Sequence, residues 1–82
     1  MSDKTVRDAV LDTVLNQIDT GDPPEARTTY DRLIDGGASN SQALHLMAAV
    51  LRVEMNEMLT KATPFDNARY AVGLAKLKAP EN

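Results

Sequence analysis

The segment from Asn40 to Lys61 constrains the fold most, because it predicts one long helix with apolar side chains on two sides. Ser39 followed by Gln42 fits the capping-box pattern that marks a helix start. At about 100° per residue, the main apolar face and the second apolar strip fall on opposite sides. The main face holds Leu44, Met47, Ala48, Leu51, Met55, Met58 and Leu59, and the second strip holds Leu46, Val50 and Val53. We therefore expect this helix to lie at the centre of the molecule.

Shorter helices are predicted on both sides of this segment. Apolar residues recur at spacings of three and four from Val6 onward, and Gly21 with the two prolines that follow ends that stretch. The pair Gly36 and Gly37 ends the next one. The predicted helices cover about 3–20, 24–35, 40–61 and 64–78, and residues 79–82 are expected to form a frayed tail.

The starts of the first and last helices are predicted from capping side chains. Ser2 or Asp3 is the expected N-cap of the first helix. In the last helix Thr63 is the expected N-cap, and Pro64 suits the first helical position. These caps place the outer helix boundaries at about residues 3 and 64.

The chain is expected to form one all-α domain, a compact bundle of about four helices. Its 82 residues are too few for two self-supporting cores. A hydrophobic content of 43% with 26% charged residues is typical of a folded chain. Alternating apolar stretches that would indicate strands are absent, as are internal repeats. We therefore treat 1–82 as a single helical domain.

Charge and composition exclude several functional classes. The net charge of −3 has the wrong sign for neutralising phosphates, so we expect no nucleic-acid partner. With no cysteine and a single histidine, thiolate metal sites and thiol nucleophiles are excluded, and we expect neither an enzyme nor a bound cofactor. Neither a membrane span nor a signal-peptide core is visible. A cytoplasmic location, in a bacterium, is the simplest expectation.

Two groups of polar residues on the central helix are candidates for a site. His45 and Arg52 lie one heptad apart on a polar line with Asn56, and such a pair suits an anion or a carboxylate. The structural alternative is a partly buried histidine bonded to a neighbouring carbonyl or acid. Glu54 and Glu57 project from one side and would suit a divalent cation if other helices added ligands. A solvated, ion-paired face explains them at least as well, because Glu57 precedes Lys61 by four residues.

Four short segments follow one another along the chain. They are the Pro-Pro-Glu turn at 23–25, the stretch Tyr-Asp-Arg-Leu at 30–33, Ala-Leu-His-Leu at 43–46 and Pro-Phe-Asp-x-x-Arg-Tyr at 64–70. Together they resemble a family of small bacterial all-helical proteins of unknown function. The resemblance covers about residues 21–77, and it implies no established activity for this chain.

The hydrophobic surplus of the central helix provides the main functional expectation. An 82-residue chain without disulfides has little surplus stability, so its second apolar strip should be covered. Two-fold pairing through Leu46, Val50 and Val53 would cover it, and so would the outer helices within one monomer. We expect a non-enzymatic protein-interaction module that binds a protein partner or its own copy as a homodimer. The alternative is a ligand- or metal-binding bundle that uses His45, Arg52, Glu54 and Glu57.

Overall fold

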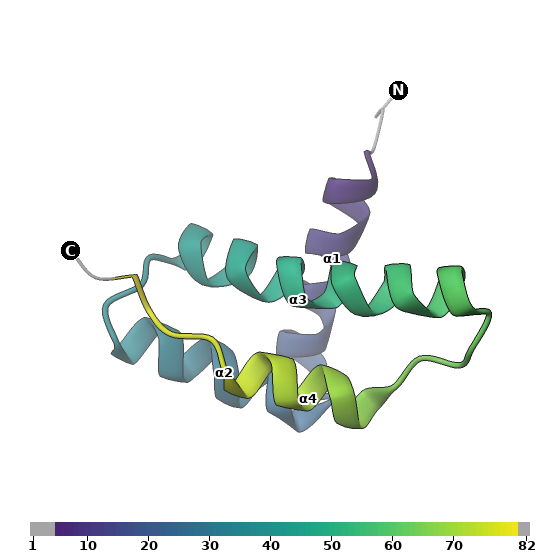
Figure 1. Ribbon diagram of the computed structural model, residues 1–82. Helices are drawn as coiled ribbons and strands as arrows, with labels where there is room; N and C mark the ends of the chain where they lie inside the picture. Colours follow the sequence, from purple (N-terminus) through teal and green to yellow (C-terminus); the bar gives the residue numbers. More distant parts are fainter. Residues whose placement is uncertain (1–4, 81–82) are drawn as a thin grey trace.

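The computed structural model describes residues 5–80, which form four helices. In chain order these are α1 (Val6–Thr20), α2 (Pro24–Asp35), α3 (Asn40–Lys61) and α4 (Asn67–Ala75). The central helix α3 contacts each of the other three. In Figure 1, α1 crosses behind α3 at a steep angle, while α2 and α4 lie below it. The all-α fold and the central position of α3 are therefore confirmed.

Local signals in the sequence explain the bounds of the two middle helices. At the start of α3, the side chain of Ser39 accepts the Gln42 N–H at 3.1 Å, and Gln42 Oε1 accepts the Ser39 N–H at 2.8 Å. This reciprocal pair is the predicted capping box. Gly21 ends α1 in the left-handed conformation with φ 71°, which glycine adopts without steric cost. The bounds of α2 and α3 coincide with the predicted ranges 24–35 and 40–61.

The predicted starts of the outer helices differ from the observed ones. Thr5 caps α1, and its side chain forms a capping box with Asp8, so that the helix begins at Val6. The predicted caps Ser2 and Asp3 lie outside the described residues. At α4 the predicted cap Thr63 is wrong, since the Asp66 carboxylate accepts the Arg69 N–H at 3.0 Å. A carboxylate at the N-cap also interacts favourably with the helix dipole. Pro64 is therefore not the first helical residue as predicted, and α4 covers Asn67–Ala75 instead of 64–78.

The core lies between α3 and the three helices around it. Tyr70 of α4 is 1% exposed, and its hydroxyl donates a hydrogen bond to Gln17 Oε1 of α1 at 2.7 Å. The ring of Phe65 packs edge-on against the ring of Tyr70, with 5.5 Å between the ring centroids. Burial raises the pKa of Tyr70 to about 12. The sequence places Leu59 on the main apolar face of α3, but its side chain is 75% exposed near the end of the helix. Leu59 is therefore not part of the core. The buried apolar residues are Val10, Val14, Ala26, Leu33, Ala38, Ala43, Leu44, Met47, Leu51, Tyr70 and Leu74.

The segment after α4 packs against the bundle instead of fraying. It runs back past α2 (Figure 1), and Ala79 and Pro80 are half-buried. Arg32 of α2 donates hydrogen bonds to the carbonyls of Leu74 and Leu77. A Cβ atom on Gly36 would lie 3.0 Å from the Cβ of Ala79, so the tail lies close to the end of α2. The expected frayed tail is therefore wrong for residues 79–80, while 81–82 lie outside the described residues.

Candidate functional site

The polar residues singled out on the central helix lie on two separate sides of it. His45, Arg52 and Asn56 line hollows between α3 and α1. Glu54 and Glu57 instead face α4, where both lie within 4 Å of the Arg69 side chain. The structure therefore does not bring these five residues together in one ligand site.

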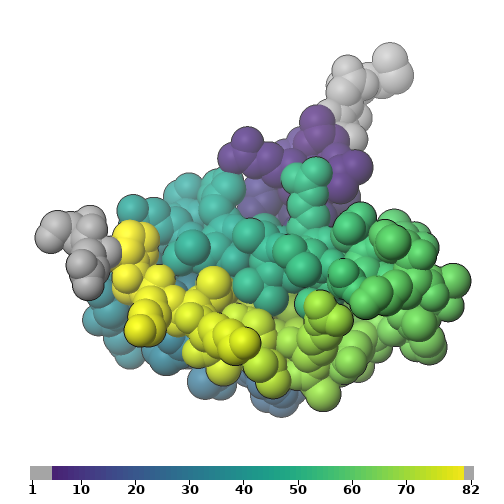
Figure 2. All heavy atoms as spheres, in the orientation of Figure 1, coloured from purple at the N-terminus to yellow at the C-terminus, as the bar shows by residue number. Residues whose placement is uncertain are grey.

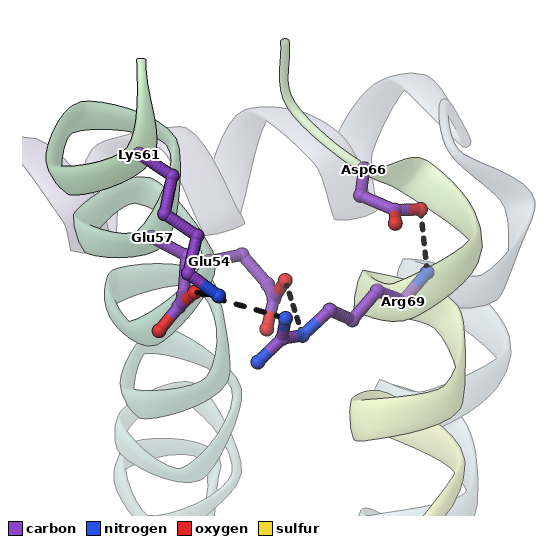
Figure 3. A network of polar contacts seen from close by, with 5 residues as sticks. All are labelled: Glu54, Glu57, Lys61, Asp66 and Arg69. Carbon is purple, nitrogen blue, oxygen red and sulfur yellow. Dashed lines mark hydrogen bonds and ion pairs between the residues drawn. The ribbon is translucent and has the colours of Figure 1, made fainter. Parts of the chain in front are cut away.

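Glu54 and Glu57 belong to a network of charges that joins α3 to α4 (Figure 3). The Nε of Arg69 lies 3.2 Å from Glu54 Oε1, and its Nη1 lies 3.8 Å from Glu57 Oε2. Lys61 Nζ completes the network at 2.8 Å from the same Glu57 oxygen. The hydrogen bond and the charge of Lys61, with a smaller contribution from Arg69, hold the pKa of Glu57 below its ordinary value. The predicted ion pair between Glu57 and Lys61 is therefore confirmed.

Glu54 is ion-paired, as one of the two interpretations of the sequence expected, but it is buried instead of solvated. Its side chain is only 8% exposed, while that of Arg69 is 51% exposed. A buried carboxylate is costly without a compensating partner, and Arg69 supplies the opposite charge. Glu54 therefore acts structurally, as the buried half of a contact between two helices.

The described part of the chain offers this carboxylate pair no further metal ligands. Within residues 5–80, no group of three His, Asp or Glu side chains lies close enough to hold a metal ion. Asp66 is the third acid drawn in Figure 3, and its carboxylate accepts the Arg69 N–H at the start of α4. Both glutamates face cationic side chains, so their arrangement is that of a helix-to-helix ion-pair network.

His45 and Arg52 lie at a hollow where α1 crosses α3. This hollow has a volume of about 190 Å³. Its polar groups come from Arg7 of α1 and from His45 and Arg52 of α3, and no acid among residues 5–80 lines it. The rest of the lining is apolar and comprises Val10, Leu11, Ala48 and Ala49. The hollow thus combines an apolar floor with cationic side chains, which suits a group that is both apolar and acidic.

The histidine at this hollow has a defined hydrogen-bonding arrangement. Arg7 Nη2 lies 2.7 Å from His45 Nε2, and His45 Nδ1 lies 2.7 Å from the carbonyl oxygen of Ser41. Because arginine only donates and a carbonyl only accepts, these partners assign a neutral ring with its proton on Nδ1. The structural alternative is confirmed in the bond to a neighbouring carbonyl, but it is wrong about burial, because His45 is exposed. The sequence did not indicate the contact between Arg7 and His45, because the two residues are 38 positions apart in the chain.

A second hollow adjoins the first and shares Val10 and Arg52 with it. It has a volume of about 230 Å³, and it is lined further by Met55, Asn56 and two exposed apolar residues. These two are Val6, 65% exposed, and Leu59, 75% exposed. Figure 2 shows the N-terminal part of α1 projecting above the surface of α3. We call the two hollows, with Val6 and Leu59 at their margin, the crossing surface.

The second apolar strip of α3 does not form one exposed surface. Val50 is half-buried, and a Cβ atom on Gly73 of α4 would lie 2.7 Å from its Cγ1 atom. Leu46 is also half-buried against the core, whereas Val53 is 55% exposed. At Val50, the structure therefore shows the alternative that the sequence left open, in which α4 covers α3 within one monomer.

Among residues 5–80, no helix combines the length and the apolar character that a membrane crossing requires. Comparisons of the chain with protein-family models, with curated proteins and with solved structures find no match. The resemblance to small bacterial helical proteins stays a prediction. By its own geometry, the crossing surface is the candidate site of this chain.

Proposed function

We propose that this protein is a non-enzymatic protein-interaction module that binds a helix of a partner protein at the crossing surface. One observation carries the proposal: two adjoining hollows at the α1–α3 crossing are lined mainly by apolar side chains, and the second includes the exposed Val6 and Leu59. Burial of apolar surface contributes about 25 cal/mol per Å² to the free energy of association. A partner that covers both hollows would therefore form a stabilised complex. Amphipathic helices are a common occupant of such grooves.

The charges at the crossing surface support a partner with acidic side chains. Arg7 and Arg52 line the hollows, and in the described part of the chain no aspartate or glutamate lines either hollow. The whole chain carries a net charge of −3, so this surface has the opposite sign to the molecule as a whole. Complementary charge favours the correct partner and its orientation more than it raises affinity. The best-fitting partner helix is therefore apolar on one face with acids beside it.

Pairing of two copies through the second apolar strip has less support. Val53 is the well-exposed member of that strip, since Val50 packs against α4 and Leu46 is half-buried. A stable interface buries about 800 Å² on each partner, which is far more than one valine offers. We therefore retain the homodimer as a competing outcome of the experiment below.

Site-specific photocrosslinking tests the proposal. A photoreactive residue replaces Ala49, which is exposed and lines the first hollow, and in a matched control it replaces Arg27, an exposed residue of α2. We expect a discrete adduct with another protein from position 49 and none from position 27. Adducts that contain only a second copy of this chain would support the homodimer instead.

The captured protein is then purified and its Kd is measured. Val6→Ser and Leu59→Ser should weaken binding, whereas Leu15→Ser, at an exposed leucine of α1 that lines neither hollow, should not. Equal effects of all three substitutions would contradict binding at the crossing surface.

A further inference from the structure

We propose that the crossing surface recognises its partner through a carboxylate side chain, which binds Arg52 and Arg7 while an adjacent apolar side chain enters the first hollow. This inference rests on the proposed function and specifies the chemistry of the partner. It concerns an acidic side chain that the partner helix carries next to its apolar face.

Arg52 has unused hydrogen-bond donors with respect to residues 5–80. Its side chain is exposed and forms no hydrogen bond or ion pair with any of residues 5–80. By contrast, the cations at the α3–α4 contact, Lys61 and Arg69, already face Glu54 or Glu57. An arginine presents five N–H donors in a planar fork that matches a carboxylate, so Arg52 is suited to a two-point contact.

Arg7 is held in place with donors remaining. One of its terminal nitrogens donates to His45 Nε2 at 2.7 Å, and that ring is itself anchored to the Ser41 carbonyl. The described residues accept no other hydrogen bond from this guanidinium. Because His45 restricts the position of the Arg7 side chain, less conformational freedom is lost when a carboxylate binds it. His45 is therefore a positioning residue in this proposal.

The size of the first hollow favours a side chain over a free small molecule. Sites for small-molecule ligands usually enclose about 300–1,000 Å³. This hollow measures about 190 Å³ and is open at the surface, which is room for one apolar side chain. A free carboxylic acid would bury little of itself here, whereas a helix brings further contacts to the second hollow and to Leu59.

The test uses two synthetic amphipathic helices that differ at one position. Both carry leucines with helical spacing, and one has a glutamate beside the leucine stripe where the other has glutamine. Their binding to the full chain is measured by NMR titration of the amide signals. We expect the glutamate peptide to bind about threefold to tenfold more tightly than the glutamine peptide. The amide signals of the protein that shift should be those of Ala48, Ala49 and Arg52. Acetate is titrated separately, and its binding should be far weaker than that of the peptide.

Five single variants locate the carboxylate contact. Arg52→Gln and Arg7→Gln should each remove most of the preference for the glutamate peptide, and Arg27→Gln, at an exposed arginine of α2, should preserve it. His45→Ala should reduce the preference, and His45→Gln, which keeps an acceptor for Arg7, should restore part of it. Circular dichroism of each variant verifies that the helices are intact.

The outcomes separate this inference from the proposed function. Equal binding of both peptides at the crossing surface would overturn the carboxylate contact and leave the interaction module standing. A glutamate preference that survives both Arg52→Gln and Arg7→Gln would also overturn it. If neither peptide binds, or if acetate binds as tightly as the glutamate peptide, the partner chemistry proposed here is wrong. The photocrosslinking at Ala49 then decides the proposed function separately.

Discussion

Gly73 of α4 lies so close to Val50 of α3 that a Cβ atom at position 73 would come within 2.7 Å of the valine Cγ1 atom. The absence of a side chain at Gly73 thus lets the two helices approach each other. Val50 thereby becomes part of the monomer's own packing instead of an outer strip that waits for a second copy.

The contact predicts a coupling between the two positions. Gly73→Ala alone should destabilise the protein or leave it unchanged, because the gain in helix propensity, about 1 kcal/mol, is opposed by overpacking against Val50. In a Val50→Ala background the added methyl has room, so Gly73→Ala should stabilise. Urea unfolding of the four proteins gives the coupling free energy, and we expect about 1 kcal/mol or more. Simple additivity of the two substitutions would refute the close approach.

Two leucines of α3 should differ sharply although the sequence places both on one face. Leu51 is 3% exposed and Leu59 is 75% exposed. We expect Leu51→Ala to lower the free energy of unfolding by about 2–5 kcal/mol, and Leu59→Ala by less than about 0.5 kcal/mol. Chemical denaturation measures both. Similar losses in the two variants would show that the end of α3 is packed differently.

The buried carboxylate of Glu54 predicts an asymmetric response to mutation. Arg69→Met removes the opposing charge and should cost about 1–3 kcal/mol in the free energy of unfolding, although the exposure of the arginine moderates the loss. Adding Glu54→Gln to that variant should recover part of the loss, because no buried charge remains to be compensated. Arg27→Met, at an exposed arginine of α2, is the control. A double variant that is less stable than Arg69→Met would count against this explanation.

Tyr70 predicts a loss of stability at alkaline pH. Burial penalises the phenolate and raises the pKa of Tyr70 from 10.0 to about 12 in the folded protein. The contribution of the neutral hydroxyl to the free energy of unfolding is fully present below pH 10. About 2–3 kcal/mol of it is lost as the pH rises from 10 toward 12.

The matched variant for this effect is Tyr70→Phe. At neutral pH it should be less stable by about 1 kcal/mol, because the hydrogen bond to Gln17 is lost. Above pH 10 the difference should shrink and then reverse, as measured by unfolding free energies at successive pH values. A constant difference from pH 7 to pH 12 would contradict a buried, desolvated hydroxyl.

The sequence predicted those parts of the fold that depend on neighbouring residues. The capping box of Ser39 and Gln42 and the left-handed Gly21 are local signals, and both were read correctly. The start of α4 was missed because Thr63 and Asp66, three residues apart, are both residue types that cap helices, and the Asp66 carboxylate is the one that accepts the Arg69 N–H. Within residues 5–80, local patterns thus located the ends of the helices to within about one turn.

The candidate site depended on contacts between distant residues. Glu54 meets Arg69 across 15 positions, and Arg7 meets His45 across 38. Helical periodicity describes which residues share a face, but it cannot show which neighbouring helix covers that face. His45 and Arg52 were therefore identified from one helix alone, and Arg7 became visible when α1 was placed against α3.

The most direct test of the central claim compares exposed apolar side chains on two sides of the molecule. Val6 and Leu59 border the crossing surface, and Val53 and Val72 are exposed elsewhere on α3 and α4. Methyl NMR spectra are recorded with and without the protein captured at position 49. We predict that the methyl signals of Val6 and Leu59 shift on binding while those of Val53 and Val72 stay in place. Shifts confined to Val53 and Val72 would contradict the crossing surface as the docking site.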